Sequence, residues 1–227
     1  MNKSQVEILS KINIKSDIKN SGFIWLNDSI KSKIIQNVTI TEISNLYPKI
    51  LIDLFKNGLI PQSEFDNISQ INFILNNKEL LKKTEDWQNL KFFVNSYYGK
   101  LSDPFNKINE NYEGIISARR LQKYIEMEYT NLLSLNSNIL YIDTDIIFSD
   151  GDIITNNIFD IQPIKENVNV FLIESIKKYF YHDGNNYIIR GKIDINKYKS
   201  EVTSILRDQK LELISIFRNQ RINELEV

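Results

Sequence analysis

The 227-residue sequence has no cysteine and only one histidine, and both facts restrict its chemistry. Without cysteine there are no disulfides and no thiolate metal sites. A single histidine, His182, argues against a histidine-based metal site or a Ser-His-Asp triad, and we expect it at the surface in a hairpin turn. Any bound metal must therefore be a hard cation held by carboxylates.

The chain also lacks a long hydrophobic run and an excess of charge of either sign. No segment approaches the roughly 18 apolar residues that cross a bilayer, and the polar N-terminal segment does not resemble a secretory signal. We therefore expect no membrane partner and a cytoplasmic location. The net charge of −1 provides no global basic field, so any nucleic-acid binding must depend on local patches.

The remaining pattern is that of a globular protein with helices grouped between strands. Its 42% hydrophobic and 25% charged residues fit one large domain or two to three small lobes. The absence of βαβ alternation indicates an α+β fold with an antiparallel sheet. The predicted strands are 37–43, one on each side of Asp-Thr-Asp, and a hairpin within 169–193; the predicted helices are 49–58, 61–83, 86–98 and 112–135.

Three acidic residues are candidates for a metal site. Asp143 and Asp145 lie two apart in Ile-Asp-Thr-Asp, and a strand's period of two places both on one face. Like charges so close repel, and Mg²⁺ is the natural counter-ion for a half-buried pair. Glu42, at the end of strand 37–43, would complete a site for two Mg²⁺ ions. The alternatives are a solvated turn for the aspartates and a surface position for Glu42.

The segment Lys-Phe-Phe-Val-Asn-Ser-Tyr-Tyr-Gly places Lys91, Asn95 and Tyr98 on one helix face. An ammonium group suits a triphosphate, and an amide and a phenol suit a sugar or base. The alternative is an ordinary amphipathic helix with a polar stripe, although asparagine is a poor residue for a helix interior.

One segment is basic. From Lys177 to Arg221 there are ten lysines and arginines against five acids. Lys177 and Tyr179 are predicted on one face of a strand, and Arg190 and Lys192 follow. A basic segment with interleaved tyrosines fits a phosphate backbone, and the alternative is a charged helical face.

In this order, the segments resemble the family B DNA polymerases over about residues 37–191. The family's motif A, Asp-x-x-Ser-Leu-Tyr-Pro, is matched by Leu46, Tyr47 and Pro48, with Glu42 at the aspartate's position and Asn45 at the serine's. Motif B, Lys-x3-Asn-Ser-x-Tyr-Gly, is matched in full by Lys91, Asn95, Ser96, Tyr98 and Gly99. Motif C, Tyr-x-Asp-Thr-Asp-Ser, is matched by Tyr141, Asp143, Thr144 and Asp145, with Ile146 replacing the serine, and a later Lys-x-Tyr is matched by Lys177 and Tyr179.

The resemblance implies a role for each candidate residue. Glu42 and Asp145 would be the main ligands of two Mg²⁺ ions, with Mn²⁺ as a substitute and Asp143 beside them. Lys91 and Asn95 would bind the incoming deoxynucleoside triphosphate. The resemblance also implies Tyr47 under the sugar, Tyr98 near the nascent base pair, and Lys177 and Tyr179 on the primer strand. Lys78 and Lys82 are assigned as further phosphate contacts only from their expected place on the antiparallel helix. Arg190 and Lys192 are assigned to the DNA from the basic segment.

The resemblance also implies a domain organisation: an antiparallel palm sheet with helices on one face, a two-helix fingers hairpin and a small helical thumb. The expected bounds are 1–36 for an N-terminal segment, 37–56 and 100–191 for the palm, 57–99 for the fingers and 192–227 for the thumb. The implied function is a template-directed DNA polymerase core without its own exonuclease, acting on primer–template DNA.

Two departures from the family leave alternatives open. Glutamate at position 42 lengthens the side chain, and a shift near 1 Å at a catalytic centre costs on the order of a hundredfold in rate. The short chain suggests a subunit of a split polymerase of the kind that would suit a virus, with other subunits carrying the missing domains. The first alternative is an impaired relative that serves as a structural or nucleic-acid-binding subunit. A primase-like enzyme is a second alternative, which the bulk of Tyr47 disfavours.

Overall fold

The computed structural model describes residues 1–13, 22–103, 113–155, 161–182 and 187–206. These residues divide into two compact units, and the chain passes between them three times. The helical unit comprises 1–23 and 45–132, and the β unit comprises 24–44 and 133–227. Each unit is considered by itself below.

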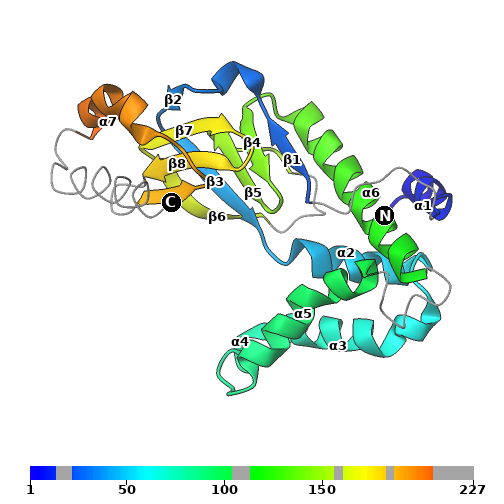
Figure 1. Ribbon diagram of the computed structural model, residues 1–227. Coiled ribbons are helices and arrows are strands. Elements are labelled where there is room, and N and C mark those ends of the chain that lie inside the picture. Colours follow the sequence, from blue (N-terminus) through cyan, green and yellow to red (C-terminus); the bar gives the residue numbers. More distant parts are fainter. Residues whose placement is uncertain (14–21, 104–112, 156–160, 183–186, 207–227) are drawn as a thin grey trace. The chain divides into compact units, whose positions relative to one another are not determined.

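The β unit contains two antiparallel sheets (Figure 1). The first has the order β1-β4-β5-β3-β6, and the second has the order β2-β7-β8-β9. The strands of the first sheet are β1 (Ile24–Leu26), β3 (Val38–Ile43), β4 (Ile139–Asp143), β5 (Ile146–Asp150) and β6 (Ile161–Val168). Those of the second are β2 (Ile34–Ile35), β7 (Val170–Ser175), β8 (Lys178–His182) and β9 (Tyr187–Arg190). The α+β class is confirmed, and the β structure forms two sheets.

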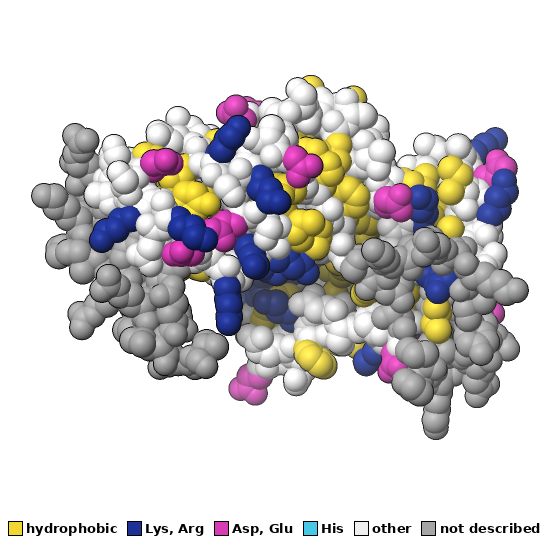
Figure 2. Space-filling model, turned by 45° about the horizontal axis from the view of Figure 1, so that its top comes forward, with side chains coloured by type: hydrophobic (Ala, Val, Ile, Leu, Met, Phe, Trp, Pro, Cys, Tyr) yellow, Lys and Arg dark blue, Asp and Glu magenta, His cyan; other side chains and the backbone are white. Residues whose placement is uncertain are grey.

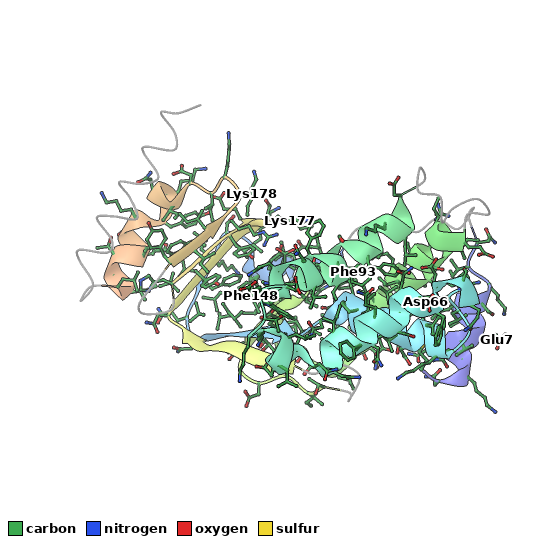
Figure 3. All side chains as sticks on the ribbon, turned by 90° about the horizontal axis from the view of Figure 1, so that it is seen from below. Glu7, Asp66, Phe93, Phe148, Lys177 and Lys178 are labelled. Atoms are coloured by element: carbon green, nitrogen blue, oxygen red, sulfur yellow. The ribbon has the colours of Figure 1, made fainter. Side chains whose placement is uncertain are left out.

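An aromatic core joins the two sheets. Tyr141 of β4 lies opposite Phe148 of β5, which lies opposite Ile40 of β3, so the three side chains share one face of the first sheet. The Phe148 ring stacks at 4.6 Å on Phe171 of β7, and Tyr141 meets Tyr179 of β8 edge-on at 5.6 Å. All of these side chains are buried, and Phe148 lies inside the unit in Figure 3.

A second core covers the opposite side of the second sheet. Buried residues of β7 and β8 pack there against the segment that follows β9. This segment contains the 3₁₀ helix η4 (Ile195–Tyr198) and the helix α7 (Lys199–Ile205). The predicted thumb is therefore helical as far as it is described, and residues 207–227 lie outside the described residues.

The helical unit contains the predicted hairpin and the long helix. Its elements are α1 (Lys3–Ser10), α2 (Leu46–Lys56), the 3₁₀ helix η2 (Gln62–Glu64), α3 (Phe65–Asn76), α4 (Lys78–Leu81), α5 (Trp87–Ser102) and α6 (Glu113–Leu135), whose last three residues belong to the β unit. Another 3₁₀ helix, η1 (Asp28–Ile30), lies in the β unit. The helix predicted over 61–83 is interrupted, because α3 ends at Asn76 and α4 is only one turn long.

The start of α2 differs from the prediction. Asn45 has the left-handed backbone conformation (φ 55°), and the helix begins directly after it at Leu46. Tyr47 and Pro48 therefore lie in the first helical turn instead of an extended segment. Proline is tolerated there because the first amide groups of a helix have no acceptor within the helix. The predicted end at Gly58, with φ 69°, is confirmed.

Two further predictions in the second sheet are wrong. His182, expected at the surface, is fully buried at the end of β8. Lys177, expected inside a strand, lies in a two-residue turn between β7 and β8 with φ 59° (Figure 3). Separately, no helix in the described ranges combines the length and apolar character that crossing a bilayer requires.

Gly191, directly after β9, is predicted to tolerate no side chain. Its φ of 72° disfavours L-residues, and an added Cβ would lie 2.5 Å from the carbonyl oxygen of Lys177. Gly191→Ala should lower the free energy of unfolding by about 3 kcal/mol or more, measured by urea denaturation. Gly58→Ala is the matched control, since its φ is 69° and nothing lies within 4 Å; it should cost only about 1–2 kcal/mol. Equal losses in both variants would contradict the steric account.

Candidate active site

The register of the first sheet brings two of the predicted acids into one row. Asp143 lies opposite Ile146, and Ile146 lies opposite Glu42, so all three side chains project from the same face. With about 5 Å between opposed Cβ atoms, the row spans on the order of 10 Å from Asp143 to Glu42. The next row inward contains Tyr141 and Phe148. The acids therefore stand beside the aromatic core that joins the two sheets.

Asp145 belongs to the turn that connects β4 and β5. This turn has two residues, and Thr144 adopts a φ of 65°. A β-branched residue in this region is a strained outlier and costs on the order of 1–3 kcal/mol. The amide of Ile43 donates a 2.8 Å hydrogen bond to the carbonyl of Asp145. The turn is thereby attached to the strand that carries Glu42.

The three acids influence one another electrostatically. Burial raises the pKa of Asp145, and the negative charges of Glu42 and Asp143 raise it further, while Arg190 acts in the opposite direction. Each of these causes acts on the ionised form of the carboxyl group. A divalent cation would relieve the repulsion among the acids. The shift is therefore a physical reason to regard the acids as one group.

Asp143 has a cationic partner that the sequence did not predict. Its carboxylate is only 2% exposed, and its Oδ2 lies 3.5 Å from Nε of Arg190, a residue of β9. No donor in the described ranges forms a hydrogen bond to this Oδ2. Although partial burial acts to lower it, the pKa of Arg190 is raised by the Asp143 carboxylate and by its neighbour Tyr179. Asp143 and Arg190 thus form an ion pair between the two sheets.

The acids supply only part of the ligand set that a divalent cation needs. Within the described ranges, no three acidic or histidine side chains are already arranged to hold a metal ion. Glu42 and Asp145 remain beside the Asp143–Arg190 pair. Mg²⁺ at nucleotide sites is commonly held by one or two carboxylates together with substrate phosphates and water. The donor set therefore fits Mg²⁺ that arrives with a phosphate ligand, and the three-carboxylate site stays a prediction.

In the helical unit, the two predicted tyrosines meet. The rings of Tyr47 on α2 and Tyr98 on α5 are 5.0 Å apart and tilted by 45°. Nε2 of Gln122 on α6 donates a 2.7 Å hydrogen bond to the hydroxyl of Tyr98. Burial raises the pKa of Tyr98 to about 12, so the phenol stays protonated at neutral pH. Two residues 51 positions apart in the sequence are therefore brought together by the packing of α2 against α5.

Gln122 was missed by the sequence analysis, although a signal for it exists. Its side chain is buried, and it stands at helical spacing from Ala118 and Ile125, which are both buried in α6. A polar residue on an apolar helix stripe needs a partner, because burying an amide without a hydrogen bond is costly. Here the partner is Tyr98.

The predicted phosphate-binding lysines have different environments. Lys91 and Asn95 lie one turn apart on the exposed side of α5, as predicted. Lys78 and Lys82 are not on the helix α3, because Lys78 begins the short α4 and Lys82 follows its end. The ammonium of Lys82 forms a 2.7 Å ion pair with Glu79.

The residues predicted on DNA are distributed around β7–β9. Lys177, in the turn, uses its backbone amide to donate a 2.9 Å hydrogen bond to the Tyr141 hydroxyl. Tyr179 is only 2% exposed, so its ring belongs to the core. Arg190 and Lys192 are exposed. On the face shown in Figure 2, lysines and arginines are interspersed with acids and do not form a continuous basic surface.

Asp145→Asn is predicted to change the pH dependence of stability. The pKa of Asp145 is raised in the folded protein, so folding favours its neutral form and the benefit is lost as the pH rises through the folded pKa. The variant should therefore gain stability relative to wild type between pH 3 and pH 7, measured by urea unfolding with EDTA. Asp150→Asn, at the exposed end of β5, controls for the loss of one charge. A gain that decreases toward pH 7 would contradict the prediction.

Comparison with known proteins gives support at the level of the fold. No protein-family model and no curated protein matches the sequence. Among solved structures, the chain is similar to phi29 DNA polymerase complexed with single-stranded DNA, with a TM-score of 0.53 and 14% identity over 87% of this chain and 56% of that one. It is also similar to phi29 DNA polymerase complexed with primer–template DNA, with a TM-score of 0.51 and 13% identity over 85% and 53% of the two chains.

An archaeal enzyme agrees with this result. The family B DNA polymerase of Pyrobaculum calidifontis gives a TM-score of 0.50 and 14% identity over 91% of this chain and 34% of that one. The chain thus spans about half the length of the phi29 polymerase and a third of the archaeal one. At such low identity the likeness concerns the fold alone, and it shows that this chain has a DNA polymerase-like fold.

Proposed function

We propose that this chain is the palm-and-fingers core of a template-directed DNA polymerase of the family B type. The observation that carries the proposal is the row of Asp143, Ile146 and Glu42 beside the Asp145 turn, within a fold similar to two such polymerases. The sequence motifs and the fold similarity point to the same class of protein, although no family model and no curated protein matches the sequence. Their agreement supports nucleotidyl transfer over a general nucleic-acid-binding role.

In the β unit, Glu42 and Asp145 are the proposed ligands of Mg²⁺, or of Mn²⁺ in its place. When bound, such ions supply Lewis-acid activation of a hydroxyl oxygen and neutralisation of a pyrophosphate leaving group. The carboxylates of this chain are suited to the task because a bound cation would relieve the mutual repulsion that raises the pKa of Asp145. Exposed Arg190 and Lys192 are the proposed contacts to the DNA backbone.

In the helical unit, the proposed substrate is a deoxynucleoside triphosphate. Exposed Lys91 supplies a positive charge for the phosphates, and Asn95, one turn later, supplies an amide. The Tyr47–Tyr98 pair forms an aromatic surface suited to a sugar and a base. The hydrogen bond from Gln122 fixes the position of the Tyr98 hydroxyl.

A second candidate function is supported by a specific observation. Asp143 is paired with Arg190, and no preformed three-ligand site exists among the described residues. Together with glutamate at position 42, this favours a catalytically impaired relative that serves as a structural or nucleic-acid-binding subunit. Exposed basic residues of the β unit would serve such a subunit equally well.

The surroundings of the chain are part of the proposal. The similar polymerases are about two to three times longer than the region matched here. We also propose that the chain works with partner chains that carry exonuclease or N-terminal functions, in a split viral system that acts in the cytoplasm. Co-purification of the tagged chain from its source would identify such partners.

Asp145→Ala is predicted to abolish primer extension, because it removes one of two proposed cation ligands. Glu42→Asp is predicted to raise extension several-fold, since the shorter arm restores the aspartate of the family motif. The assay uses a primed template, deoxynucleoside triphosphates and Mg²⁺ or Mn²⁺, with and without partner chains. Asp150→Ala, at the exposed end of β5, is the control and should leave extension unchanged. Absent extension by the wild type under all conditions would favour the non-catalytic subunit.

Lys91→Ala is predicted to raise the KM for the incoming nucleotide by about tenfold, because one charged contact to phosphate contributes on the order of 1.5–3 kcal/mol. The measurement is steady-state single-nucleotide insertion. Lys56→Ala, which removes an exposed lysine at the end of α2, is the matched control. If both variants raise the KM equally, Lys91 has no specific role in nucleotide binding.

A further inference from the structure

Two polar contacts attach strand β4 to the second sheet. The hydroxyl of Tyr141 accepts a hydrogen bond from the backbone amide of Lys177, in the turn between β7 and β8. Two residues further along the same face of β4, Asp143 is paired with Arg190 at the end of β9. Both contacts lie on the side where the aromatic rings of the two sheets pack together.

The backbone around Arg190 is built for this approach. Gly191 passes so close to the Lys177 carbonyl that a Cβ would overlap it, which brings the end of β9 against the β7–β8 turn. Arg190 also interacts with Tyr179, whose ring is fixed by Tyr141 and Phe148. The backbone at Arg190 is therefore held by packing, and the half-exposed side chain extends from it to Asp143.

The three acids differ in burial and in whether a nearby cation compensates their charge. Asp143 is almost completely buried and has a guanidinium nearby, whereas Glu42 is exposed and Asp145 is half-buried. A buried carboxylate needs a compensating charge, and Arg190 supplies it without any added ion. The net charge that remains for a divalent cation is that of Glu42 and Asp145.

We propose that Arg190 is a positioning residue that holds the buried Asp143 carboxylate in an ion pair between the two sheets. The pair divides the acids by role: Asp143 anchors the second sheet to β4, and Glu42 with Asp145 takes the divalent cation. The inference rests on the proposed function only for the cation, because the anchoring contact lies between residues of the β unit. It also gives Arg190, assigned above to the DNA backbone, a prior task inside the protein.

The test compares the Mn²⁺ dissociation constants of single and double variants that remove these charges. It uses isothermal titration calorimetry on the full chain without DNA or nucleotide. Glu42→Gln and Asp145→Asn should each weaken the affinity for Mn²⁺ by about tenfold or more. Asp143→Asn should change the dissociation constant by less than about twofold, because its charge is already compensated. Arg190→Gln should raise the affinity for Mn²⁺ by about threefold, because the Asp143 carboxylate near the site is then no longer compensated.

The double variant Asp143→Asn/Arg190→Gln should bind Mn²⁺ like the wild type, and Arg190→Lys should be close to it. Lys178→Gln is the control for removing one positive charge from the same hairpin, at an exposed position away from Asp143. If Arg190 had only a structural role, Arg190→Gln would lower the affinity for Mn²⁺ or leave it unchanged. If Asp143→Asn weakens Mn²⁺ as much as Asp145→Asn does, Asp143 is a metal ligand and the inference is overturned.

Urea unfolding of the same variants separates this inference from the proposed function. The losses of unfolding free energy in Asp143→Asn and Arg190→Gln should be coupled and not additive, because each removes the same contact. Additive losses would overturn the anchoring role. Absence of Mn²⁺ binding by a folded wild-type chain, both alone and with a deoxynucleoside triphosphate added, would overturn the proposed function and the assignment of cation ligands.

Discussion

Antiparallel pairing of β4, β5 and β3 is the constraint on which the candidate site depends. In this register the row of Tyr141, Phe148 and Ile40 enters the core, and the adjacent row presents Asp143 and Glu42. A slip of one residue would turn a strand's side chains to the other face of the sheet, removing its aromatic residue from the core and its acidic residue from the site together. The hydrophobic core between the sheets therefore selects the register, and the register positions the acids.

The same logic accounts for the two tyrosines of the helical unit. Neither Tyr47 nor Tyr98 is placed by its own helix alone; the packing of α2 against α5 brings them together, and Gln122 on α6 holds one of them. In both units a packed apolar scaffold carries a few polar groups at its margin. This arrangement explains how a polymerase-like fold persists at 14% sequence identity, because packing tolerates many substitutions that preserve volume and pattern.

Local patterns predicted much of the fold and part of the site. Short-range periodicity predicted the strands around Asp-Thr-Asp and the long helix that ends at Leu135. The family resemblance predicted that the motif residues within each unit would lie close together. The Asp143–Arg190 pair does not, because 47 residues separate its members and no periodicity relates them. The burial of His182 was also missed: a hairpin pattern predicts its position along the chain, whereas its burial depends on tertiary packing. Gln122 was predictable, since its position on an apolar stripe is visible in the sequence.

The left-handed conformation of Thr144 indicates where the shape of this turn comes from. A short peptide containing only β4, the turn and β5 would have no reason to keep threonine in this conformation, because the local preference is against it. The hydrogen bond from Ile43 and the packing of three strands impose it from outside. The acidic turn is thus a product of the completed sheet, and its geometry forms only when distant parts of the chain have already assembled.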